Sequence, residues 1–87
     1  MMKTQSGLEI ELKDISLDQR IDANETMIQE KYYAAWVKYC RYGIKSINGV
    51  EAKENVDDLL LSLTNNEILE IGFEIAKRAN LTPKKKF

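Results

Sequence analysis

The 87 residues of the chain are enough for one domain and no more. A chain this short buries only about 60–65% of the surface that its unfolded form exposes, so a deep substrate cavity would compete with the core for apolar side chains. Apolar residues make up 44% and charged residues 31% of the chain, which argues against a disordered chain and against a membrane protein. The charges of the 13 basic and 14 acidic side chains nearly cancel, so no overall electrostatic field favours binding to nucleic acid or to an anionic membrane.

The N-terminal segment is predicted to be a flexible end, residues 1–6, followed by a short strand. Leu8, Ile10 and Leu12 alternate with charged side chains, and this period of two places the apolar side chains on one face of a strand. A strand needs a second strand to pair with its backbone groups. The candidate within the chain is Ser46–Ala52, which contains an asparagine-glycine turn signal, and the alternative is a strand of another chain.

Two helices are predicted to follow, one beginning at Ser16 and one spanning about Met27–Lys45. The Ser16 hydroxyl and Gln19 form a capping-box pattern, which is typical of a helix N-terminus. A continuous helix would turn Glu25 into the apolar side, so we expect a break near Asn24–Thr26. The second helix is amphipathic, and its apolar face contains Tyr32, Tyr33, Trp36, Val37, Tyr39, Cys40, Gly43 and Ile44.

Two further helices are predicted in the second half of the chain. Asn55 is the expected cap of a short, leucine-rich helix. Thr64 and Glu67 form a second capping-box pattern, which begins the last helix. Asn80 is expected to close that helix in a left-handed conformation.

These patterns together predict a mainly α fold: one helical domain over residues 7–81, with about four helices and a short N-terminal β-strand in a minimal hairpin or at a sheet edge. Residues 82–87 are expected to form a flexible basic tail. Met1–Gly7 lacks the apolar core of a signal peptide, and no apolar run approaches the roughly 20 residues that span a bilayer. Cys40 is the only cysteine, which agrees with a reducing compartment, so we expect a cytoplasmic protein.

The sequence offers little chemistry. It contains no histidine, the commonest general base and metal ligand. Cys40 lies on the predicted apolar face and is interpreted as a buried, inert thiol. Asp57 and Asp58 fall in the first turn of a predicted helix, where the helix dipole favours acids, so a capping role is preferred to a metal or catalytic one. We therefore expect no catalytic, cofactor-binding or metal-binding residues, and no enzyme activity.

Six residues are candidates for contacts with a protein partner. They are Leu8, Ile10, Leu12, Lys38, Tyr42 and Lys45. The first three would bind at an open strand edge, or alternatively belong to the core. The other three would form an exposed patch on the basic side of the central helix, or alternatively part of a solvated polar face. Tyr32, Trp36 and Tyr39 fall opposite those lysines, so they cannot stack bases beside them, and nucleic acid is not an expected partner.

The order of these elements resembles the small tail assembly chaperones of long-tailed bacteriophages. The resemblance covers about residues 7–82 and is carried by Leu8-Glu-Ile-Glu-Leu-Lys, Ile15-Ser-Leu, Cys40-Arg-Tyr-Gly-Ile-Lys-Ser-Ile-Asn-Gly-Val-Glu, Leu63-Thr-Asn-Asn-Glu-Ile-Leu-Glu-Ile and Arg78-Ala-Asn-Leu-Thr. It implies a mainly helical, non-enzymatic protein that binds the tape-measure protein, keeps the long apolar helix of that protein soluble and recruits tail-tube subunits. A homo-oligomer is a further expectation, because an unpaired strand and a thin core both gain from a partner.

A small phage or bacterial regulator that binds DNA is the alternative from a different class of function. The turn at Thr64–Asn66 is short enough for a helix-turn-helix corner. The helix that follows begins with Glu67 and Glu70, whose charges DNA phosphates would repel. The sequence therefore favours the protein-binding interpretation.

Overall fold

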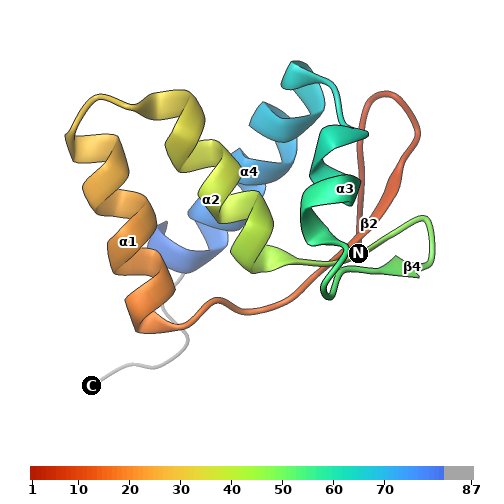
Figure 1. The fold of residues 1–87 in the computed structure, drawn as a ribbon, viewed down its shortest axis with the longest axis horizontal. Helices are drawn as coiled ribbons and strands as arrows, with labels where there is room; N and C mark the ends of the chain where they lie inside the picture. Colours follow the sequence, from red (N-terminus) through yellow and green to blue (C-terminus); the bar gives the residue numbers. More distant parts are fainter. Residues whose placement is uncertain (82–87) are drawn as a thin grey trace.

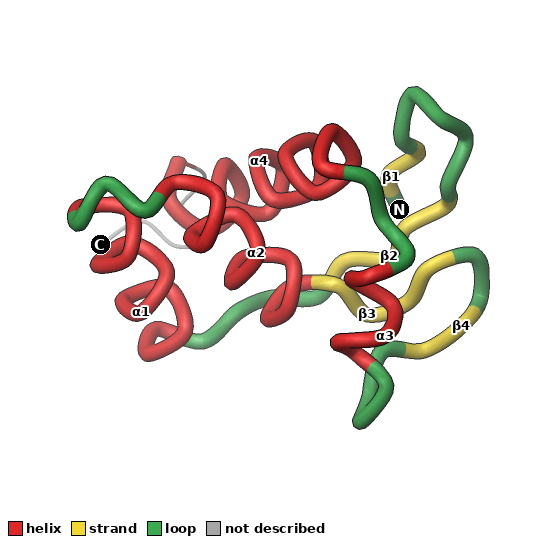
Figure 2. Tube along the Cα trace, turned by 45° about the horizontal axis from the view of Figure 1, so that its top comes forward, coloured by secondary structure: helices red, strands yellow, loops and turns green. Residues whose placement is uncertain are grey.

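The strands gather at one end of the molecule, and the first long helix lies at the other end (Figure 1). A computed structural model describes residues 1–81, which form four helices and four short strands. The elements in chain order are β1 (Met2–Lys3), β2 (Glu9–Leu12), α1 (Leu17–Ile28), α2 (Tyr32–Gly43), β3 (Ile44–Ile47), β4 (Val50–Glu51), α3 (Val56–Leu61) and α4 (Asn65–Leu81). Figure 2 shows the strands and α3 at one end and α1 at the other. The mainly helical fold class predicted from the sequence is confirmed.

The four strands form one antiparallel sheet in the order β1-β2-β3-β4. Ile10 of β2 pairs with Ile47 of β3, so of the two alternatives that the sequence left open, the structure shows pairing within the chain. Asn48 and Gly49 join β3 to β4 with φ values of 49° and 83°. Both angles belong to the left-handed region that two-residue hairpin turns require and that asparagine and glycine tolerate.

The prediction of a flexible N-terminus at residues 1–6 differs from the structure, in which Met2–Lys3 forms the first strand. A tight turn folds this segment back onto β2. Thr4 is buried, its backbone N–H donates to the Leu8 carbonyl at 3.0 Å, and its hydroxyl accepts from the Leu8 N–H at 3.0 Å. Gly7 supplies a φ of 98° in the same turn. Strand β2 therefore has a neighbour on each side, β1 and β3. The strand predicted from Leu8, Ile10 and Leu12 is central in the sheet and is not an open edge.

α1 and α2 are separate helices, as the sequence predicted. The Ser16–Gln19 capping box begins α1, with bonds of 3.2 and 2.9 Å. The break lies later than the expected Asn24–Thr26, since α1 runs to Ile28, and the Thr26 hydroxyl donates to the Asp22 carbonyl within the helix. The chain reverses at Glu30, whose φ is 62°.

α2 is the central helix of the core and packs against both α1 and α4. Two glycines permit its close approach to α4. A Cβ on Gly43 would lie 2.6 Å from Ile75 Cγ2, and a Cβ on Gly72 would lie 3.0 Å from the Trp36 carbonyl oxygen. The buried apolar residues around this crossing are Ile10, Ala23, Ala35, Tyr39, Cys40, Ile44, Ile47, Leu60, Leu63, Ile68, Ile71 and Ile75.

The aromatic face predicted for the central helix is only partly buried. Tyr39 is fully buried, whereas Tyr32 and Tyr33 are 55% and 45% exposed. These two tyrosines occupy the first turn of α2. The helix also ends at Gly43, and Ile44 belongs to β3, where it is 1% exposed.

Of the three helix ends predicted in the second half of the chain, the structure agrees with the start of the last helix and differs at Asn55 and Asn80. Thr64 and Glu67 form the expected capping box, with bonds of 2.8 and 3.1 Å. The Asn55 side chain does not cap α3, because its Oδ1 accepts from the Lys53 N–H at 2.8 Å. α4 continues through Asn80 to Leu81. The predicted basic tail, residues 82–87, lies outside the described residues. Within residues 1–81, no helix has the length and apolar character that crossing a membrane demands.

Candidate protein-binding surface

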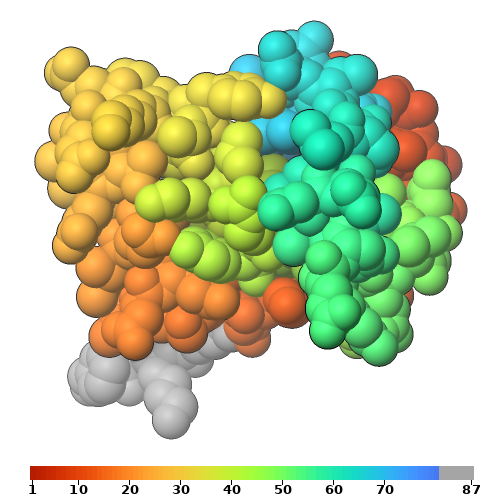
Figure 3. Space-filling model, viewed as in Figure 1, coloured from red at the N-terminus to blue at the C-terminus, as the bar shows by residue number. Residues whose placement is uncertain are grey.

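Two of the residues predicted to form an exposed contact patch are tied to a neighbouring helix. Lys38 and Tyr42 project from α2 toward Asp22 of α1. Figure 3 shows the yellow-green surface of α2 between the orange surface of α1 and the blue-green surface of α3. Lys38 Nζ lies 2.9 Å from Asp22 Oδ1 and also donates to the Thr26 hydroxyl at 2.9 Å. The Tyr42 hydroxyl donates to Asp22 Oδ2. Both side chains are therefore already engaged in holding α1 to α2.

The charges in this contact shift the acidities of its members. The hydrogen bond from Tyr42 lowers the pKa of the Asp22 carboxyl, and the bond from Lys38 acts in the same direction. The same hydrogen bond raises the pKa of Tyr42, because the negative carboxylate holds the hydroxyl proton. Asp22 is therefore ionised at neutral pH and acts as a polar clamp between two helices.

The remaining predicted contact residues are not brought together. Lys45 lies on β3 and pairs with Glu11 of β2 at 3.7 Å. Ile10 is fully buried in the centre of the sheet, so the prediction that it contacts a partner at an open edge is wrong. Leu8 and Leu12 are half-buried and pack against the core. The alternative that places these strand residues in the core describes them better.

A different surface gathers exposed apolar side chains. An open groove of about 620 Å³ lies where α4 meets α2 and β1. We call it the aromatic groove, and its lining residues are Met2, Lys3, Trp36, Leu69, Glu70, Phe73 and Glu74. None of these residues was a partner-binding candidate from the sequence.

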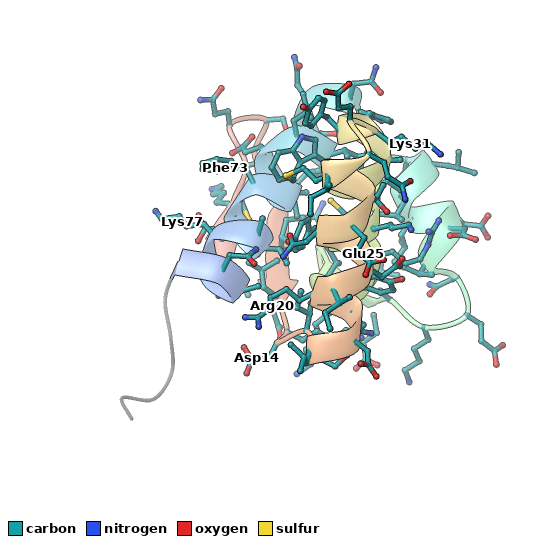
Figure 4. The ribbon with its side chains drawn as sticks, turned by 90° about the vertical axis from the view of Figure 1, so that its left-hand side faces the viewer. Asp14, Arg20, Glu25, Lys31, Phe73 and Lys77 are labelled. Carbon is teal, nitrogen blue, oxygen red and sulfur yellow. The ribbon has the colours of Figure 1, made fainter. Side chains whose placement is uncertain are left out.

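The floor of the aromatic groove is built from two helices. Leu69 and Phe73 are four residues apart on α4 and are 40% and 59% exposed. The Phe73 ring lies 6.2 Å from the Trp36 ring of α2, with the two planes at 53°. Figure 4 shows Phe73 and Lys77 on the outward side of α4. Because Gly72 lets α2 approach α4 closely, Trp36 reaches the same surface as Phe73.

The rim of the aromatic groove is acidic and is held by the N-terminal turn. Glu70 accepts from the Gln5 backbone N–H at 3.2 Å. Glu67, one turn earlier on α4, accepts a hydrogen bond from Ser6, which lowers the Glu67 pKa. Glu74 pairs with Arg78 at 3.2 Å. The first two contacts fix the β1–β2 turn against α4 and place Met2 beside the aromatic side chains.

The signal that could have indicated this groove is present in the sequence. Ile68, Ile71 and Ile75 form the buried stripe of α4. Leu69 and Phe73 lie beside that stripe, which widens the apolar face beyond what one neighbouring helix covers. The position of β1, however, depends on the turn at residues 4–8, which the sequence did not reveal.

The single thiol lies in the interior of the folded protein. Cys40 is fully buried, and burial raises its pKa to about 12. Its Sγ donates to the Ile68 carbonyl at 3.4 Å. Among residues 1–81 there is also no group of three or more cysteine and acidic side chains arranged to hold a metal ion. The expected burial of the thiol is confirmed.

No protein-family profile, no curated protein and no solved structure matches this chain.

Proposed function

We propose that the chain is a non-enzymatic assembly chaperone that binds an apolar helical segment of a longer protein in the aromatic groove. The resemblance to tail assembly chaperones of long-tailed bacteriophages names the client in this proposal. The client is the tape-measure protein, and the complex then recruits tail-tube subunits. Binding takes place in the cytoplasm of the host cell.

The observation that carries the proposal is the exposure of Leu69 and Phe73 beside Trp36. Two large apolar side chains at positions i and i+4 of one helix, with an aromatic ring from a second helix, form the floor of a groove that an amphipathic helix can enter. Aromatic residues are frequent energetic anchors of protein interfaces. A chain with so small a core has few large apolar side chains to spare. Leaving Leu69 and Phe73 exposed therefore favours a role in partner binding over a role in the core.

The rim defines the chemistry of the client segment. Glu70 and Glu74 border the apolar floor, and among residues 1–81 Lys3 is the only basic residue that lines the groove. A client helix that complements this surface carries large apolar residues on one face and lysine or arginine beside them. Such a helix exposes apolar surface before assembly, so covering it prevents aggregation.

The DNA-binding alternative receives less support from the same residues. Three basic side chains of the central segment have acidic partners: Lys38 pairs with Asp22, Arg41 with Asp57 and Lys45 with Glu11. Phosphate contacts would have to displace these partners. A mobility-shift assay at moderate salt separates the two functions, since tight and salt-sensitive DNA binding would reverse this ranking.

Co-expression with the tape-measure protein encoded in the same genome tests the proposal. The full chain is expected to co-purify with the client and to keep it soluble. Phe73→Lys places a charge on the groove floor and is expected to weaken binding at least about 30-fold, as loss of an anchor costs about 2 kcal/mol or more. Leu61→Lys is the matched control, because Leu61 is 83% exposed on α3 and does not line the groove.

Two results would contradict the proposal. The first is a tape-measure protein that is soluble without this chain. The second is equal weakening, or no weakening, in both variants while their thermal unfolding midpoints stay unchanged. Sedimentation of the chain alone adds a further check, because a dimer sealed through Phe73 would mean that a second copy occupies the groove.

A further inference from the structure

A second cavity lies at the other end of α4, outside the aromatic groove. It has a volume of about 290 Å³ and lies between the start of α1 and the C-terminal half of α4. Its apolar wall consists of Leu12, Ile15, Leu17, Ile75 and Ala79. Small-molecule pockets usually measure about 300–1,000 Å³. This pocket is therefore better suited to one large side chain than to a whole cofactor.

The charges around this pocket are mainly positive. Lys13, Arg20 and Arg78 line it, together with one acidic residue, Asp14, and Arg78 also pairs with Glu74 at 3.2 Å. Arg20 Nη1 donates to the Ala79 carbonyl at 3.0 Å, which places the guanidinium between α1 and α4 (Figure 4). A guanidinium has five N–H donors, and this bond uses one of them. The planar, positively charged guanidinium of Arg20 therefore lies beside the apolar wall of the pocket.

We propose that this basic pocket binds an acidic, apolar segment of a protein partner. One large apolar side chain of the segment enters between α1 and α4, and a neighbouring carboxylate pairs with Arg20 at the rim. Arginine is well suited to this task, because its donors match the two oxygens of a carboxylate. Leu17 is 60% exposed and extends the apolar wall to the mouth of the pocket.

The occupant differs in chemistry from the client of the aromatic groove. Glu70 and Glu74 line that groove, so its complement is basic, whereas the complement of the basic pocket is acidic. Glu74 and Arg78 pair with each other at 3.2 Å, so the contrast in charge between the two sites rests on Glu70 in the aromatic groove and on Lys13 and Arg20 in the basic pocket. An adaptor that brings two proteins together needs two separate binding surfaces.

Two peptides and the full chain test the proposal. In the first 12-residue peptide, leucine and phenylalanine alternate with glutamate, and in the second, lysine replaces every glutamate. The acidic peptide is expected to bind and to shift the amide NMR signals of Leu12, Ile15 and Ile75, with an affinity that falls as salt is added. Leu17→Asp is expected to weaken this binding about 10-fold or more through like-charge repulsion.

The matched control for that variant is Leu61→Asp, which places the same charge on an exposed leucine outside the pocket and leaves the affinity unchanged. Equal binding of both peptides, or equal effects of both substitutions, would overturn the proposal. A response to phenylacetate without a response to the acidic peptide would also overturn it and would indicate a small-molecule site. Phe73→Lys is expected to leave acidic-peptide binding intact, so failure at the aromatic groove is distinguishable from failure here.

Discussion

α4 is joined to α2 and to α1 by two different kinds of contact. It meets α2 backbone to backbone, since a Cβ on Gly72 would lie 3.0 Å from the Trp36 carbonyl oxygen. It meets α1 through polar side chains, among them Asn24, whose Nδ2 donates to Asn80 Oδ1 at 3.0 Å. Close apolar packing tolerates no added atom, whereas polar contacts can be lost one at a time. The α1–α4 contact is therefore expected to open at a lower cost than the α2–α4 contact.

The largest effect is expected from adding bulk where α2 and α4 cross. Gly72→Val forces three extra carbons against the backbone of Trp36 and is expected to lower the free energy of unfolding by about 3 kcal/mol. Denaturant unfolding followed by circular dichroism measures this change. Lys77→Val, on the exposed side of the same helix, controls for helix propensity and should cost under about 1 kcal/mol. Similar losses in both variants would mean that the close approach is not the cause.

A smaller loss is expected in the polar contacts of α1. The Tyr39 hydroxyl donates to Asn24 Oδ1 and accepts from Asn80 Nδ2, so one oxygen links three helices. Tyr39→Phe removes both bonds with no change of shape and is expected to cost about 1–2 kcal/mol. Hydrogen exchange should rise more in α1 than in α2. Tyr33→Phe, whose hydroxyl bonds Asn65 at the surface, is the control, and an equal effect there would count against the three-helix link.

The clamp at Asp22 is expected to make the α1–α2 contact sensitive to acid. Folding lowers the Asp22 pKa through its bonds to Tyr42 and Lys38. A carboxyl with a lowered folded-state pKa stabilises the fold fully above its unfolded-state pKa of about 3.9, and this contribution is lost as the pH falls through the folded-state value. Asp22→Asn should therefore flatten the acid side of the stability profile. Urea midpoints measured from about pH 7 down to about pH 3 test this, and a profile unchanged from that of Glu25→Gln would refute it.

The smallest effect is expected at the sheet. Lys45 and Glu11 pair across β3 and β2 at 3.7 Å, and both side chains are about half exposed. Such surface pairs contribute little, so Lys45→Ala should change stability by less than about 1 kcal/mol. A loss as large as that of Tyr39→Phe would show that the sheet depends on this pair more than its exposure suggests.

Local signals in the sequence identified the parts of the fold that depend on neighbouring residues. The capping boxes at Ser16 and Thr64 and the hairpin turn at Asn48 each involve groups within three or four residues, and each was predicted correctly. The period of two at Leu8, Ile10 and Leu12 indicated a strand that needs a partner, but it left open whether that partner lies in the same chain. The fold class could also be predicted, because the periodic patterns that indicate helices and strands involve neighbouring residues.

The features that were missed depend on contacts between distant segments. Glu67 and Glu70 hold the β1 turn through residues more than 60 positions away, so no local pattern indicates β1. Tyr42 was predicted to be an exposed contact because its position on the helical wheel is polar. The wheel cannot show that Asp22 of α1 lies opposite. The aromatic groove was missed in the same way, since it appears only when α2, α4 and β1 come together.

The burial of Cys40 gives the molecule a built-in reporter. The chain has one thiol, and it lies in the centre of the α2–α4 contact with no exposed surface. A thiol-specific reagent can reach it only when the helices part, so the rate of modification follows the frequency of opening of the core. Partner occupancy of either end of α4 can then be followed, in unlabelled protein, as a slowing of that single reaction.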